Sequence, residues 1–120
     1  MNISYSELIL LDNSVIENVD RLLVAGTDRI ELMMDGASWD GQNGDFASLT
    51  RELRARQAAY TVHPAAWDIN LTAQTRILRD AAYDHHIQAI RFAADIGASQ
   101  VVLHPGFLGS PCFNRETAQR

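Results

Sequence analysis

The sequence contains no lysine, because all ten of its basic residues are arginine. This absence excludes a Schiff-base nucleophile and the lysine of a P-loop from these 120 residues. A single cysteine, Cys112, excludes an internal disulfide and a zinc cage of cysteines, and we interpret it as incidental. No apolar run reaches the roughly 18 residues of a membrane span, and the N-terminus lacks the basic segment of a signal peptide. We therefore expect a cytoplasmic protein with no membrane partner.

The chain is also poor in positive charge, with a formal net charge of −5. Binding to nucleic acid needs a basic face that neutralises phosphates. Residues 35–45 hold three aspartates and neither arginine nor lysine. The acidic balance therefore disfavours nucleic acid as a partner, although a local basic groove would still be compatible with it.

Hydrophobic residues follow helical and strand periods in turn along the chain. Val15, Val19 and Leu22 form a helical stripe, and Gly26 follows where a glycine commonly ends a helix. Strands are predicted at residues 2–6, 29–34, 59–63 and 100–104. Helices are predicted at residues 14–25, 46–56 and 72–96, and a fourth helix is predicted to begin at Asn114. Such alternation predicts an α/β fold with parallel strands.

An internal similarity supports this organisation. The eight residues from Ala25 (Ala-Gly-Thr-Asp-Arg-Ile-Glu-Leu) resemble the eight from Ile96 (Ile-Gly-Ala-Ser-Gln-Val-Val-Leu). Four βα units are half of a TIM barrel, which has about 250 residues. We therefore predict that residues 1–120 form a single partial TIM barrel domain of four strands. The alternative is a flavodoxin-like sheet, but no phosphate-binding glycine loop follows the first strand.

Half a barrel would have two unpaired sheet edges and an uncovered inner face. Such a unit is expected to be marginally stable or dimeric by itself. The sequence thus predicts a fragment, a truncated gene, or a half-barrel that pairs with a missing C-terminal half or with a second copy.

Two histidines, His63 and His104, end predicted strands, and each directly precedes a proline. The active site of a βα barrel lies at this end of its strands. Two imidazoles from separate strands can converge on one divalent metal such as zinc, manganese or cobalt. The alternative is that each imidazole only hydrogen-bonds a loop backbone. Side-chain alternation would place Glu31 on the inner face and Asp35 at the mouth.

The segments around both histidines also carry a resemblance. Residues 60–71 (Tyr-Thr-Val-His-Pro-Ala-Ala-Trp-Asp-Ile-Asn-Leu), residues 101–106 (Val-Val-Leu-His-Pro-Gly) and the strand at residues 26–32 resemble the xylose isomerase-like TIM barrel superfamily. This group contains sugar and sugar-phosphate isomerases and epimerases, and also endonuclease IV-type apurinic-site nucleases. Histidines ending the third and fourth strands bind metal in the endonuclease IV-like members, which implies His63 and His104 as ligands. The remaining ligands come from strands five to eight, so the site is expected to be incomplete here.

The resemblance implies a sugar or sugar-phosphate isomerase or epimerase. A divalent metal would polarise the sugar's oxygens, and a carboxylate would move a proton between adjacent carbons. We identify no catalytic base, because the superfamily's epimerases hold such acids mostly in the later half. The alternatives are an endonuclease IV-like apurinic-site nuclease and a truncated, non-catalytic half-barrel that self-associates. The acidic residues 35–45 favour the isomerase.

Five side chains in the loops after the strands are candidates for binding a small carbohydrate: Trp67, Asp68, Asn70, Asp35 and Trp39. Trp67 could pack on the apolar face of a sugar or cover its own loop. Asp68 and Asn70 could bind hydroxyl groups, although such residues more often cap turns. For Trp39 we favour a packing role over a place in the substrate pocket.

Three further polar residues lie within predicted helices and strands. Adjacent helical residues point about 100° apart, so His85 and His86 do not form a shared metal site, and we interpret them as helix-surface histidines. Glu31 lies in an apolar strand and is expected to need a partner, such as Arg29 or a group outside this segment.

Overall fold

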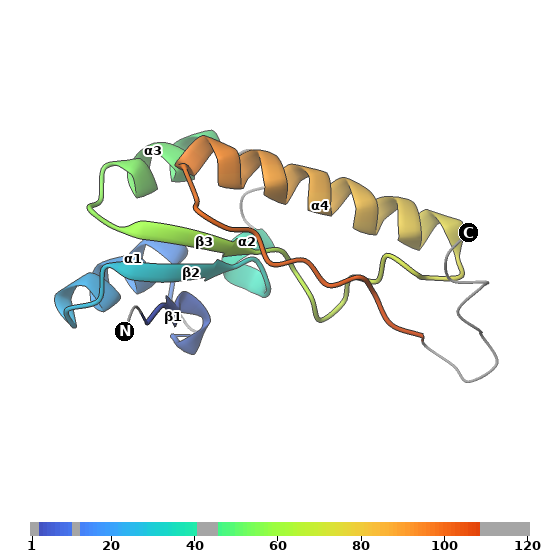
Figure 1. Ribbon diagram of the computed structural model, residues 1–120, viewed down its shortest axis with the longest axis horizontal. Coiled ribbons are helices and arrows are strands. Elements are labelled where there is room, and N and C mark those ends of the chain that lie inside the picture. Colours follow the sequence, from blue (N-terminus) through green and yellow to red (C-terminus); the bar gives the residue numbers. More distant parts are fainter. Residues whose placement is uncertain (1–2, 11–12, 41–45, 109–120) are drawn as a thin grey trace.

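The computed structural model describes residues 3–10, 13–40 and 46–108. Its elements are β1 (Tyr5–Ser6), the 3-10 helix η1 (Glu7–Ile9), α1 (Val15–Val24), β2 (Arg29–Met33), α2 (Ala37–Asp40), α3 (Ala47–Arg54), β3 (Ala59–His63) and α4 (Arg76–Ile96). The strands form one parallel sheet in the order β1-β2-β3, as Figure 1 shows. The α/β class and the bounds of the third predicted strand are confirmed. Cys112 and the helix predicted from Asn114 lie outside the described residues.

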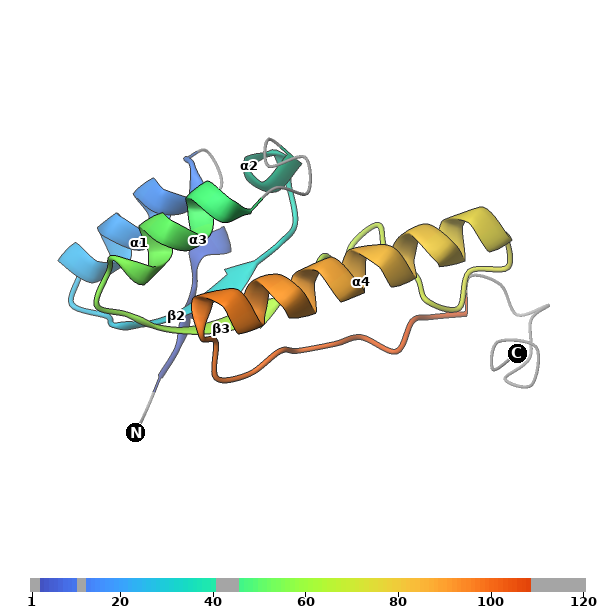
Figure 2. The same ribbon diagram turned by 90° about the horizontal axis from the view of Figure 1, so that it is seen from above.

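The strands present two different faces. Alternate residues of β2 and β3 are buried in the hydrophobic core, namely Ile30, Leu32, Tyr60 and Val62. Figures 1 and 2 show α1, α3 and α4 on one side of the strands. Glu31 and His63 have the opposite parity and lie on the other face, where no helix packs within the described part of the chain. The predicted orientation of Glu31, away from the helices, is thus confirmed.

The fourth predicted strand is present only as a single bridge between Val62 and Val101. Val62 N–H donates to Gln100 O (3.0 Å), and Val102 N–H donates to Val62 O (2.9 Å). The next donor that β3 would offer on this side is the nitrogen of Pro64, which carries no hydrogen. The prediction of four strands is therefore not confirmed, because this proline ends the ladder where residues 102–104 should have continued it.

The helix ends follow their sequence signals. Ser14 and Glu17 form a capping box at the start of α1. Gly26 (φ +92°) follows α1 and Gly97 (φ +73°) caps α4, both in the left-handed conformation that favours glycine. α4 begins at Arg76 rather than at residue 72, and α2 lies within a segment predicted to be loop. No helix among the described residues combines the length and the apolar character needed to cross a membrane.

A buried carboxylate connects η1, α1 and α2. Glu7 is 1% exposed; its Oε1 accepts from Trp39 Nε1 (3.0 Å) and its Oε2 accepts from Asn18 Nδ2 (2.8 Å). Burial raises the pKa of Glu7, and the hydrogen bonds from Asn18, Trp39 and the Met33 backbone oppose this rise. Glu7 was not predicted from the sequence, because its partners come from separate elements.

Folding should consequently depend on the proton of Glu7. Its folded pKa lies above the ordinary value of 4.5, so the folded chain binds this proton more tightly than the unfolded chain. The resulting stabilisation is complete below about pH 4.5 and is lost as pH rises through the folded pKa. In Glu7→Gln, urea unfolding between about pH 4.5 and 8 should show a smaller decrease of stability with pH than in the wild type. The matched control at the exposed Glu52, Glu52→Gln, should keep the wild-type dependence; equal profiles for all three proteins would disprove the coupling.

Candidate functional site

His63 and His104 come together beyond the carboxyl end of β3. His63 is the last residue of β3, and His104 follows the bridged segment that pairs with this strand. Their Nε2 atoms are 3.0 Å apart, and the ring centroids are 4.9 Å apart. The structure therefore brings together the two imidazoles that the sequence placed at the ends of neighbouring strands.

The backbone fixes the tautomer of His63. Its Nδ1 lies 2.8 Å from the carbonyl oxygen of Pro64. A carbonyl oxygen can only accept a hydrogen bond, so Nδ1 carries a hydrogen, and in the neutral imidazole Nε2 then keeps its lone pair. That lone pair faces His104, whose Nε2 is placed to donate to it.

This arrangement fits two ligands of one metal ion. Two nitrogens each about 2.1 Å from an ion lie roughly 3 Å apart at the right angle of an octahedral ion and about 3.4 Å apart at the tetrahedral angle of zinc. The observed 3.0 Å is therefore close to what an octahedral ion requires. Metal-binding histidines usually donate their second ring N–H to a carbonyl or carboxylate, as His63 does to Pro64. Among the described residues, no cluster of three or more His, Cys, Asp or Glu side chains is placed to hold a metal.

Side chains from two other elements hold the loop that follows β3. Ala65 N–H donates to His85 Nε2 (3.1 Å), Ala66 N–H donates to both carboxylate oxygens of Asp35 (3.1 and 3.0 Å), and Trp67 N–H donates to Asp35 Oδ1 (3.3 Å). Asp35 is only 5% exposed. Its carboxylate, predicted from the sequence to bind substrate, joins this loop to the end of β2.

Asn70 connects the loop after β3 with the segment after His104. Its Oδ1 accepts from the N–H groups of Thr72 and Phe107 (both 3.0 Å) and from Thr72 Oγ1 (2.9 Å). Its Nδ2 donates to the carbonyl of Phe107 (2.9 Å). The amide predicted to bind a sugar hydroxyl is thus committed to backbone and Thr72.

The two tryptophans occupy opposite environments. Trp39 is 6% exposed, its ring packs beside Phe46 and Phe92, and its indole N–H donates to Glu7. The packing role favoured for Trp39 is confirmed, and its ring is not available to line a substrate pocket. Trp67 is 59% exposed, and the neighbouring Asp68 is also exposed. Both remain predicted substrate-binding residues on the loop after β3.

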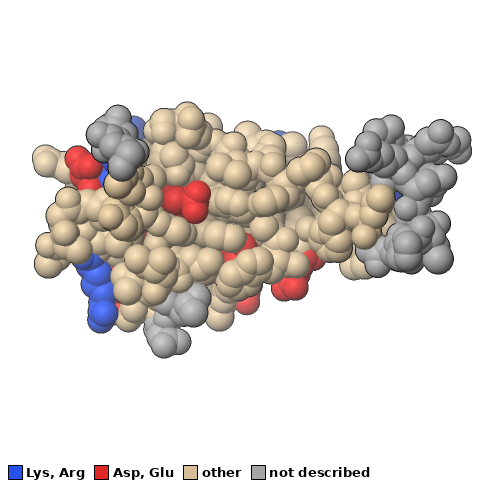
Figure 3. Space-filling view, turned by 60° about the horizontal axis from the view of Figure 1, so that its bottom comes forward, with Lys and Arg blue, Asp and Glu red and all other residues tan. Residues whose placement is uncertain are grey.

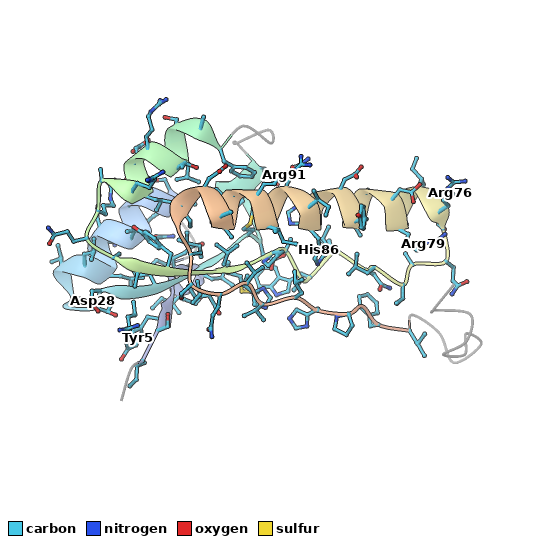
Figure 4. All side chains as sticks on the ribbon, turned by 45° about the horizontal axis from the view of Figure 1, so that its top comes forward. Tyr5, Asp28, Arg76, Arg79, His86 and Arg91 are labelled. Atoms are coloured by element: carbon cyan, nitrogen blue, oxygen red, sulfur yellow. The ribbon has the colours of Figure 1, made fainter. Side chains whose placement is uncertain are left out.

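The interpretation of His85 and His86 as surface histidines is wrong. His86 is buried and its Nδ1 donates to Ala82 O (2.7 Å); it projects from α4 toward the strands, whereas Arg91 projects away from them (Figure 4). His85 is half-buried and accepts from Ala65 N–H. The long helix lies across the loop after β3, so its histidine pair faces protein rather than solvent.

Comparison with known proteins agrees with this fold. No protein-family model and no curated protein matches the sequence. The structure is similar to the crystal structure of a D-tagatose 3-epimerase-like protein, with a TM-score of 0.72 and 19% sequence identity. The similarity covers 90% of this chain and 39% of that one, so this chain spans less than half the length of that protein. The likeness shows a shared fold over this part of that protein.

Proposed function

We propose that this chain contributes the N-terminal βα units of a metal-dependent sugar or sugar-phosphate isomerase or epimerase, with His63 and His104 as two metal ligands. The observation that carries the proposal is the 3.0 Å approach of the two Nε2 atoms, with His63 held as the tautomer that can bind metal. The fold shared with an epimerase-like protein supports the reaction class. Zinc, manganese and cobalt all suit imidazole ligands.

The residues of this chain would have separate roles in metal binding and in sugar binding at such a site. A bound metal would polarise the carbonyl and hydroxyl oxygens of the sugar. His63 and His104 would hold it, and the exposed ring of Trp67 would pack on the apolar face of the sugar. Asp68, exposed beside it, would bind a hydroxyl group. The other ligands and the catalytic carboxylate would come from further βα units or from a second copy, which would also cover the open face of the sheet.

The distribution of charge favours carbohydrate over nucleic acid as the ligand. Figure 3 shows one face of the molecule, on which uncharged residues predominate, with separate acidic side chains and only small basic areas. An apurinic-site nuclease would need broad phosphate contacts around its metal. Cleavage of an abasic DNA duplex that depended on both histidines would overturn the isomerase assignment. Metal-dependent exchange of solvent deuterium into a ketose, next to its carbonyl, would support it.

Metal binding itself gives a direct test. Titration with Co²⁺ or Zn²⁺, followed by calorimetry, should show binding that weakens at least tenfold in His63→Gln and in His104→Gln, because each change removes one ligand. The double variant should bind no ion at the site. Gln88→Leu is the control, because Gln88 lies at an exposed position of α4 and contacts neither histidine of the pair in the described structure. Unchanged affinity in the double variant would refute the site.

A further inference from the structure

One peptide group lies between two histidines. The carbonyl of Pro64 accepts from His63 Nδ1 (2.8 Å), and the N–H of the same peptide, on Ala65, donates to His85 Nε2 (3.1 Å). A trans peptide is planar, and its C=O and N–H point in opposite directions. A rotation of this peptide would therefore break both hydrogen bonds at once.

His85 is in the state that this contact requires. A backbone N–H can only donate, so His85 Nε2 must carry a lone pair and the ring must be neutral. Burial lowers the pKa of His85, the neighbouring His86 lowers it further, and Asp35 acts in the opposite direction. The imidazole thus stays an acceptor at neutral pH.

The surroundings fix this acceptor in place. α4 is held against the core by its buried residues Ala82, Ala89 and Phe92. Asp35 accepts from the next two N–H groups of the loop, on Ala66 and Trp67. These bonds restrict rotation of the preceding Pro64–Ala65 peptide.

We infer that His85 is a positioning residue for the His63–His104 pair: it orients the Pro64–Ala65 peptide, and that peptide holds the hydrogen of His63 on Nδ1 and leaves Nε2 free to bind metal. The inference deepens the proposed function, because the site it serves is the proposed metal site. The hydrogen bonds on the two sides of this peptide also polarise each other, which strengthens the donation from His63 Nδ1 to the Pro64 carbonyl. His85 itself would not touch the ion.

The test compares variants that remove or keep the acceptor. His85→Leu and His85→Ala remove it, whereas His85→Gln can place an amide oxygen near the position of Nε2. Gln88→Leu, at an exposed position of the same helix, controls for the added leucine. Nitrogen-15 NMR reports which ring nitrogen of His63 carries hydrogen, and the chain has only four histidines to assign.

We expect His63 to carry its hydrogen on Nδ1 in the wild type, His85→Gln and Gln88→Leu, and to become a mixture of tautomers in His85→Leu and His85→Ala. Co²⁺ affinity should fall at least tenfold in the two variants that lack the acceptor and should recover in His85→Gln. If His85→Leu does not fold, His85→Ala decides the result. An unchanged tautomer in the folded variant would overturn the inference.

The two proposals fail in distinguishable ways. If no protein binds Co²⁺ but the tautomer of His63 still depends on residue 85, the metal site is refuted and the positioning role stands. If Co²⁺ binds through His63 and His104 in every His85 variant with equal affinity, the positioning role is refuted and the metal site stands.

Discussion

Replacing Phe92 with alanine should lower the free energy of unfolding by about 3–5 kcal/mol, the usual cost of removing a buried aromatic ring. Phe92 is 1% exposed, and its ring lies 4.9 Å from Phe46 and 5.7 Å from Trp39, measured between centroids. These rings join α4 to α2 and to the residue that precedes α3. The cavity would lie where three helical segments meet, so the surrounding side chains could not collapse to fill it.

Chemical denaturation followed by circular dichroism would measure this loss. Tyr83→Ala is the matched control, because Tyr83 is an exposed aromatic residue of the same helix. It should change stability by no more than about 0.5 kcal/mol. A loss below about 1 kcal/mol in Phe92→Ala would contradict the placement of this ring in the core.

The second large effect is expected from Gly106→Ala, which should destabilise the loop and weaken metal binding at least tenfold. Gly106 has φ +104°, and an added Cβ would lie 2.7 Å from Asn70 Oδ1 and 2.9 Å from Thr72 Oγ1. The backbone conformation costs an alanine about 1–3 kcal/mol. The overlap also displaces the amide that holds Phe107. His104, two residues earlier, would then lose its fixed position beside His63.

Gly26→Ala separates backbone strain from steric overlap. Gly26 has a similar φ of +92°, but an added Cβ would meet nothing within 4 Å. This control should lose stability through strain alone and should bind Co²⁺ as the wild type does. Equal metal affinity in Gly106→Ala and Gly26→Ala would show that the contacts of Asn70 do not position His104.

Much of the fold could be predicted from local patterns. The bounds of β3 were predicted correctly because an apolar run at residues 59–63 is cut by Pro64. Ser14 and Gly26 marked the ends of α1 through capping preferences that act over a few residues. The same Pro64 explains the missing fourth strand, since its nitrogen cannot donate to Val102. That consequence required knowing which strand pairs with which.

The sequence by itself determined that His63 ends a strand and directly precedes a proline, and that His104 does so in a second segment with strand periodicity, because strand periodicity and the following prolines are local properties. Only the tertiary structure decided what the other polar residues do. Asp35 and Asn70 were predicted to bind substrate and Trp39 was predicted to pack, and each has a hydrogen-bond partner about 30 or more positions away in the chain. Burial removes water from these groups, so each must find a hydrogen bond wherever the fold brings a partner. The tertiary structure also places His85, predicted to lie on the surface, where its Nε2 accepts from the N–H of Ala65.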